Sequence, residues 1–306
     1  MFDLQQVINS SLSLRFVAAL AQRLSPRVGH SIADFVAEQI ARQRNSKLVQ
    51  AVRANQWVVT GEVLRGEALD LVVRATFRHW ARCIFDLYHY IENPEAAKQL
   101  IVLEPSFQEW ARRPEFERRG GCRGLMIVGL HLSNFDLVLQ WLGGQGMKPL
   151  ALTIPDPRGG RRMEYEIRRR TGMNLIPASV GAFRQAVRHL QQGGMVATGI
   201  DRPIPNPEVS PRFFGRPAAL PVHHIFLATK AHVPIIIVVA HLQEDERYHV
   251  FASELIEMEP DPDREVGALR NAEKVLAIAE KFIRRYPQQW SVPLPVWSRV
   301  MDLIPK

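Results

Sequence analysis

Residues 125–136 read Leu-Met-Ile-Val-Gly-Leu-His-Leu-Ser-Asn-Phe-Asp, and this stretch decides the fold class. The apolar run 125–130 has the length of a buried strand. The apolar residues of 137–142, which Gly143 and Gly144 end, indicate a largely buried helix. The polar residues between them therefore fall on a strand-to-helix turn, where open α/β sheets bind ligands.

His131 and Asp136 lie five positions apart across this turn. A hydrogen bond between them would fix the tautomer of the imidazole and leave its other nitrogen free to act as a base. A histidine beside an aspartate is also a common structural pair. From the residues alone, both interpretations stay open.

The rest of the chain predicts an α/β sheet of mostly parallel strands behind a helical N-terminal layer. We expect strands at 125–130, 149–154, 174–177, 195–200, 234–242 and 248–253. We expect helices at 67–90, 107–113, 135–143, 161–171, 181–191, 222–231 and 265–286. No flexible linker divides the chain, so residues 1–306 are predicted to form one domain, with 1–118 as the layer and 119–306 as the α/β core.

Two amphipathic patterns begin the chain. Leu12, Phe16, Leu20 and Leu24 recur every four residues, and a second apolar pattern covers 28–40. Such helices pack on the domain or lie in a membrane interface with arginines near the lipid head groups. The two arrangements can coexist.

Composition narrows the class of protein to which the chain can belong. Hydrophobic residues are 46% of the chain, yet no apolar stretch reaches 18 residues, so we expect no spanning helix. Asp3 stands where a secretory signal is basic, and Cys83 and Cys122 form no disulfide or metal pattern, which favours a cytoplasmic protein. His223 and His224 have no companions at ligand spacing, so no metal site is expected.

The net charge of +8 indicates an anionic partner. Residues 158–188 hold eight arginines against Glu164 and Glu166. Arginines on a helix after a strand can clamp a phosphate, but a solvated face, an acidic carrier protein or an anionic membrane would also fit. The chain has no nucleic-acid recognition motif.

A third polar cluster follows the strand expected to end at residue 200. It opens with Asp201-Arg202 and continues through Glu208 to Phe213-Phe214-Gly215. A long proline-rich loop after a strand is a usual place for function. The two phenylalanines could wall an apolar slot or simply anchor the loop.

Together the three clusters resemble a known family. The His-x4-Asp motif of His131 and Asp136 resembles the signature of glycerolipid acyltransferases, and its extended form resembles the branch that holds lipid A late acyltransferases and phosphatidylinositol mannoside acyltransferases. Phe213-Phe-Gly-Arg-Pro-Ala218 resembles that branch's Phe-Phe-Gly block. Asp201-Arg202 resembles the mannoside members, and Asp136 stands where lipid A members generally carry glutamate.

The resemblance implies transfer of a fatty acyl chain from acyl-CoA or acyl-ACP to a hydroxyl of a membrane lipid or glycolipid. His131 would be the general base and Asp136 its orienting partner, with no bound cofactor or metal. The residues expected to contact substrate are Ser133, Asn134, Arg168, Arg170, Asp201, Arg202, Glu208, Phe213, Phe214 and Gly215. The protein is expected at the cytoplasmic face of the cell membrane. The alternatives are a lipid-binding protein without activity and a thioesterase-like hydrolase.

Overall fold

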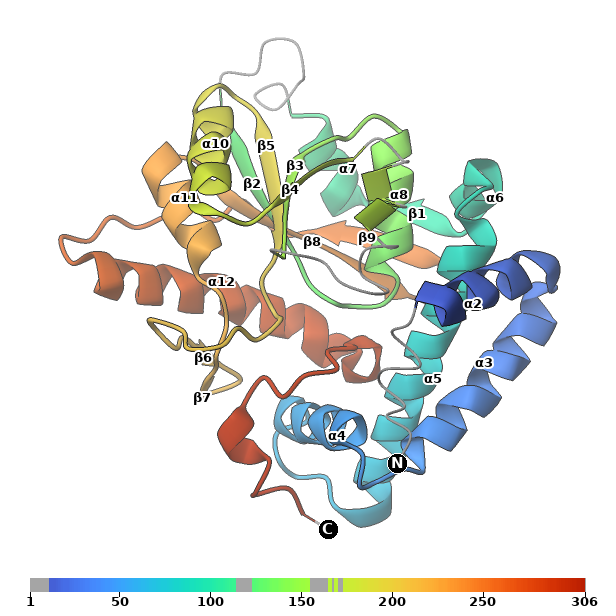
Figure 1. Ribbon diagram of the computed structural model, residues 1–306. Coiled ribbons are helices and arrows are strands. Elements are labelled where there is room, and N and C mark those ends of the chain that lie inside the picture. The colour runs from blue at the N-terminus through green and yellow to red at the C-terminus, as the bar shows by residue number, and fades with distance from the viewer. Residues whose placement is uncertain (1–10, 114–122, 155–164, 167, 170–172, 306) are drawn as a thin grey trace.

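The fold is a seven-stranded sheet with helices on both faces (Figure 1). The computed structural model describes residues 11–113, 123–154, 165–166, 168–169 and 173–305. The strand order is β1-β9-β8-β2-β5-β3-β4. The strand bounds are β1 Ile101–Leu103, β2 Leu125–Gly129, β3 Leu150–Thr153, β4 Asn174–Pro177, β5 Met195–Gly199, β8 Ile235–Leu242 and β9 Tyr248–Ala252.

The expected α/β sheet of mostly parallel strands is confirmed. β8, β2, β5, β3 and β4 run parallel in that order, and β9 pairs antiparallel with β8, so that β9 and the edge strand β1 run opposite to the other five. The six expected strands are present. The sequence analysis missed the short edge strand β1, which pairs with β9, and the two-stranded hairpin of β6 (Arg212–Phe213) and β7 (Arg216–Pro217).

Alternate residues of the central strands enter two separate cores, as the two-residue period of a strand requires. Met126 and Val128 of β2 lie in one core, and Leu125 and Ile127 lie in the other. The first core is covered by α10 Val180–Gln191, α11 His223–Ala231 and α12 Arg264–Arg285. The second is covered by α6 Pro94–Gln99, α7 Pro105–Ala111 and α8 Phe135–Gly144.

Several helix starts are fixed by side-chain caps that the sequence supplies. Ser46, Ser179 and Asp263 accept hydrogen bonds from backbone N–H groups in the first turns of α4, α10 and α12. The expected helix over 161–171 falls mostly outside the described residues. Residues 165, 166, 168 and 169 are helical.

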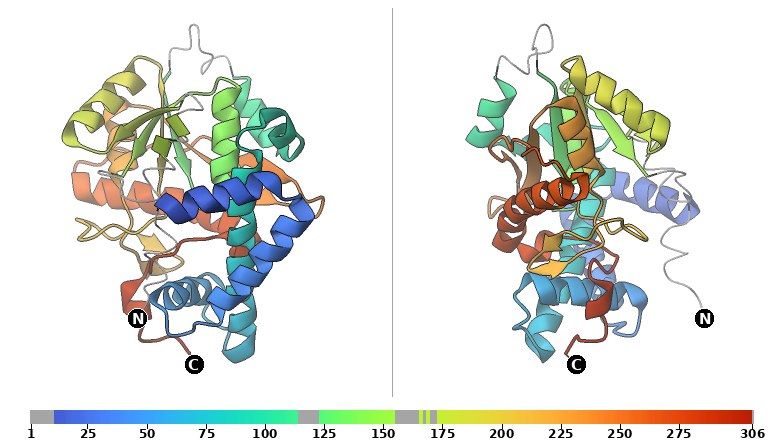
Figure 2. Two further views of the ribbon diagram at one scale, coloured as in Figure 1. Left: turned by 45° about the vertical axis from the view of Figure 1, so that its right-hand side comes forward. Right: turned by 90° about the vertical axis from the view of Figure 1, so that its left-hand side faces the viewer.

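The N-terminal helices pack beside the sheet around one long helix, α5 Gly66–Tyr90 (Figure 2). α2 Ser11–Arg23 and α3 Pro26–Ala41 both pack on α5. α4 Lys47–Val59 is held by the C-terminal segment, because Asn55 donates hydrogen bonds to the carbonyls of Val292 and Leu294. These contacts join the N-terminal helices to the C-terminal segment.

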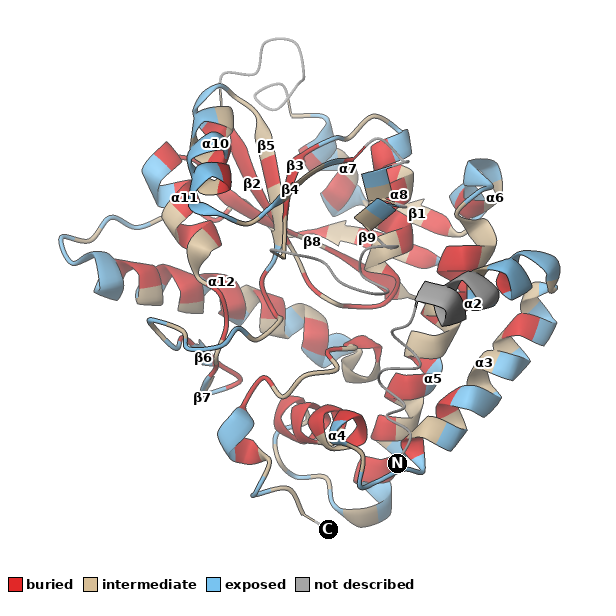
Figure 3. Ribbon diagram, viewed as in Figure 1, coloured by how far each residue is buried: buried red, intermediate tan, exposed pale blue. Residues whose placement is uncertain are grey.

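The second amphipathic pattern forms helix α3. Its orientation favours the membrane-interface arrangement over packing of the apolar stripe on the domain. Val28, Ile32, Phe35 and Val36 of α3 are exposed, so this apolar stripe points away from the domain (Figure 3). Within the described residues, no helix is both long enough and apolar enough to cross a membrane.

Candidate active site

His131 and Asp201 meet at the carboxyl edge of the sheet because β2 and β5 are neighbouring parallel strands. Gly129 pairs in register with Gly199, and each polar residue follows two positions later. The His131 ring also lies against Gly199, since a Cβ there would be 3.6 Å from Cε1. Two loops 70 residues apart thus place an imidazole and a carboxylate side by side.

Asp201 has no exposed surface and accepts three hydrogen bonds. The Nδ1 of His131 bonds Oδ1 at 2.7 Å, and the backbone N–H of His131 donates to Oδ2 at 2.7 Å. The indole Nε1 of Trp290 donates to Oδ2 at 2.8 Å. These donors compensate the burial of the carboxylate.

The two pKa values move in the directions expected of an ion pair. Burial would raise the pKa of Asp201, but His131 and Trp290 outweigh it and the pKa is lowered. Burial would lower the pKa of His131, but the charge and hydrogen bond of Asp201 outweigh it and the pKa is raised. An ionised Asp201 only accepts, so the proton is on Nδ1 and the lone pair of the neutral ring is on Nε2. The His131 side chain is 26% exposed, which leaves this ring open to a substrate.

Asp136 occupies a different place from the one expected of it. Its carboxylate is paired with Arg168, whose Nε donates to Oδ1 at 2.8 Å and whose Nη2 donates to the same oxygen. The expected hydrogen bond between the imidazole of His131 and the carboxylate of Asp136 is not formed, because Nδ1 of His131 bonds Asp201 instead. Asp136 lies in the first turn of α8, where its carboxylate faces Arg168. The carboxylate beside His131 comes instead from Asp201, which follows the neighbouring strand β5. Asp136 still acts on His131 through its charge, which raises the pKa of the imidazole.

Ser133 and Asn134 hold the loop in place. Both are buried, with the Ser133 hydroxyl 3.1 Å from Nε2 of His79 and the Asn134 amide donating to the carbonyl of Cys83. The Ser133 N–H donates to the carbonyl of Gln289 at 2.8 Å. Their expected contact with substrate stays a prediction, but the Ser133 N–H is already used by Gln289 and is therefore not available to an oxyanion.

The Phe-Phe-Gly block also has a structural role. Phe213 has no exposed surface and stacks on Trp297 at 5.5 Å between ring centroids, with Trp290 at 6.0 Å. Phe214 and Gly215 form the turn between β6 and β7, both with positive φ. The role of the two phenylalanines in lining an acyl slot stays a prediction. In this structure Phe213 is fully buried and supports the tryptophan that bonds Asp201.

Comparison with known protein families identifies the family of the chain. A family model described as bacterial lipid A biosynthesis acyltransferase matches residues 10–299. The chain belongs to this family. Membership supports an enzyme that transfers acyl groups in lipid biosynthesis. A comparison with curated proteins found no match.

Three further residues are expected at the acyltransferase site, and their contacts with substrate stay predictions. Arg202 follows Asp201 and is half-buried, whereas Glu208 is exposed on the loop. Arg170 lies outside the described residues. The sequence analysis missed the roles of Trp290 and His79. For Trp290, the one available signal was a tryptophan in a proline-rich C-terminal segment. For His79, a histidine within a helical pattern gave no signal.

Proposed function

We propose that this acyltransferase moves a fatty acyl chain from a thioester donor, acyl-CoA or acyl-ACP, to a hydroxyl of a membrane lipid or glycolipid. His131 is the general base and Asp201 is its orienting partner. The observation that supports this most strongly is the 2.7 Å bond between Nδ1 of His131 and buried Asp201. This bond leaves the lone pair of the neutral ring on Nε2, in a side chain that is 26% exposed.

The reaction needs one proton transfer in each direction. Nε2 of His131 takes the proton of the acceptor hydroxyl while its oxygen attacks the thioester carbonyl. The tetrahedral intermediate then breaks its C–S bond, and the leaving sulfur takes the proton back from the imidazolium. Asp201 stabilises the imidazolium between the two steps, since its charge favours the protonated ring. A base in this position contributes roughly 10²–10⁴-fold to the rate.

The oxyanion of the intermediate needs donors that are already in place. The first turn of α8 supplies them in this proposal. The N–H of Leu137 already donates to Oδ1 of Asn134 at 3.3 Å. The N–H groups of Phe135 and Asp136 have no acceptor among the described residues. The positive end of the helix dipole adds to their effect.

Arg168 has a revised role in the proposal. Held by Asp136 next to His131, it lowers the pKa of the imidazole and so favours the neutral base. Its guanidinium also remains the best candidate for a phosphate of donor or acceptor. Because the chain has a net charge of +8, we further propose that the protein attaches peripherally to the cytoplasmic face of an anionic membrane.

The test compares two histidines changed in the same way. We expect His131→Asn to abolish the transfer of labelled acyl chains from acyl-CoA or acyl-ACP to extracted membrane lipids, followed by mass spectrometry. His232→Asn is the control, because His232 is exposed and its left-handed backbone suits asparagine. Wild-type turnover by folded His131→Asn would contradict the proposal. Release of free fatty acid without an acylated lipid would favour the hydrolase, and neither product would favour a lipid-binding protein.

A further inference from the structure

Two successive helices, α2 and α3, carry six exposed apolar side chains that belong to neither core. We call this set the α2–α3 apolar face. Its members are Val17, Leu20, Val28, Ile32, Phe35 and Val36. They make up half of the large hydrophobic side chains that are exposed in the described part of the chain, and they fall within 20 consecutive residues. A concentration of this kind marks an interaction site.

The packing of α3 on α5 fixes the outward direction of this face. The inner side of α3 is lined by the small residues Gly29, Ala37 and Ala41, and a Cβ at position 29 would overlap the ring of Phe85. Small residues bring the two helices close together. Rotating α3 to bury the apolar stripe would force larger side chains into that contact.

Ion pairs along one flank hold the same register. Asp34 bonds Nε of Arg82 at 2.7 Å, and Glu38 bonds Arg78 at 3.2 Å and lies 3.6 Å from Arg74. All three arginines belong to α5. The acidic side chains of α3 are therefore neutralised within the protein, and the apolar stripe beside them stays outward.

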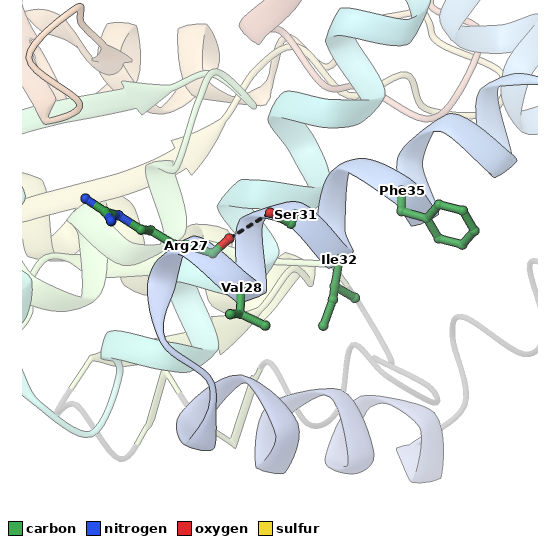
Figure 4. Close-up of a pocket in the computed structure, with 5 residues that line it drawn as sticks. All are labelled: Arg27, Val28, Ser31, Ile32 and Phe35. Atoms are coloured by element: carbon green, nitrogen blue, oxygen red, sulfur yellow. Dashed lines mark hydrogen bonds between the residues drawn. The ribbon is translucent and has the colours of Figure 1, made fainter.

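The α3 part of the face lines an open groove of about 390 Å³ (Figure 4). Val28 and Ile32 project to the same side of α3, and Phe35 extends from the next turn. Phe35 is 65% exposed. Arg27 lines the groove, and neither Arg27 nor Arg23 has an acidic partner within ion-pair distance among the described residues. Apolar side chains thus lie next to Arg27, a cation with no ion-pair partner among the described residues.

We propose that the α2–α3 apolar face inserts into the surface of an anionic phospholipid bilayer. An interfacial helix needs apolar side chains to enter the acyl region and basic ones to meet the head groups. Residues 17–47 hold five basic and two acidic side chains, and both acidic ones are paired with α5. Arg42 and Arg44 also have acidic partners. Arg23, Arg27 and Lys47 are therefore the cations offered to the head groups. A second copy of this chain fits less well, because two such faces would bring Arg23 and Arg27 against the same cations.

The choice of a bilayer as partner rests on the proposed lipid acceptor, and the fold links the two sites. α5 packs on α3, and it also supplies His79 and Cys83 to the loop of Ser133 and Asn134. A bilayer on α3 would therefore lie one helix away from the loop that follows His131. This position suits an enzyme whose acceptor is itself a membrane lipid.

The experiment is vesicle flotation of the full chain with mixed phosphatidylcholine–phosphatidylglycerol vesicles. We expect Ile32→Ser/Phe35→Ser to lower the partition coefficient at least about tenfold, since two apolar side chains no longer enter the acyl region. The control is Leu71→Ser/Val180→Ser, which removes two exposed apolar side chains elsewhere. Arg23→Gln/Arg27→Gln should weaken binding at low salt and have less effect at high salt.

Equal flotation of the wild type and Ile32→Ser/Phe35→Ser would overturn the proposal, provided that circular dichroism shows both folded. A vesicle-free dimer that depends on Phe35, seen by light scattering, would assign the face to a second copy. Transfer assayed with detergent-solubilised acceptor separates the two proposals. Flotation without transfer would contradict the acyltransferase chemistry alone, and transfer without flotation would contradict the membrane face alone.

Discussion

The indole of Trp290 and the carboxylate of Asp201 are joined by a hydrogen bond of 2.8 Å, on the oxygen that also accepts the backbone N–H of His131. Both side chains are buried. The C-terminal segment therefore helps to fix the group that orients the proposed base, and Phe213 packs behind the same indole.

Trp290→Phe should remove the donor to Asp201 and keep most of the packing. The expected loss in the free energy of unfolding is about 1.5–3 kcal/mol, because the acceptor is charged and buried. Turnover should fall as well, since Asp201 is held less firmly. Trp297→Phe is the matched control, because its indole N–H is buried without a partner among the described residues. Equal losses in urea unfolding of the two variants would show that the Trp290 bond contributes nothing.

Asp136 and Arg168 should act as a coupled pair. Their side chains are only 19% and 21% exposed. A double-mutant cycle with Asp136→Ala and Arg168→Ala should give a coupling free energy of about 1 kcal/mol in both unfolding and kcat/KM. The exposed pair of Arg123 and Glu257, in the same cycle, should give a value near zero. Additive effects at Asp136 and Arg168 would mean that the pair does not form in solution.

Phe213→Ala should destabilise the fold by about 3–5 kcal/mol, as expected for a buried phenylalanine. Phe35→Ala, at an exposed position, should change stability by no more than about 0.5 kcal/mol. Because Phe213 has no exposed surface, Phe213→Leu should leave the preference for acyl-chain length unchanged. A changed preference among acyl donors of increasing length would restore the hypothesis that this block lines the acyl slot.

The sequence predicted the sheet well because hydrophobic period and turn residues are local signals. Each of the six expected strands is present with bounds within a residue or two, and the turn carrying His131 is where the apolar run ends. The edge strand β1 was missed because three residues carry little periodicity. The hairpin of β6 and β7 was missed because it is shorter still.

The partner of His131 could not be predicted because strand order is not a local property. The sequence placed His131 and Asp201 each just beyond a strand, but it could not show that β2 and β5 are neighbours. Asp136, close in sequence, was therefore chosen as the partner. The direction of the α3 stripe was unpredictable for a similar reason, because an amphipathic pattern gives an apolar face without saying what covers it.

The central claim is that His131 is the base and that Asp201 orients it and raises its pKa. The direct measurement is the pH dependence of kcat/KM for the wild type, Asp201→Asn and Asp136→Asn. A base must be deprotonated to act, so activity should rise with pH through the pKa of His131. Removing the charge of Asp201 lowers that pKa, so the acid limb of Asp201→Asn should move to lower pH, with a rate reduced roughly 10²-fold or more. Asp136→Asn should move it in the same direction by less. An acid limb that stays in place in Asp201→Asn, with turnover near that of the wild type, would contradict the account.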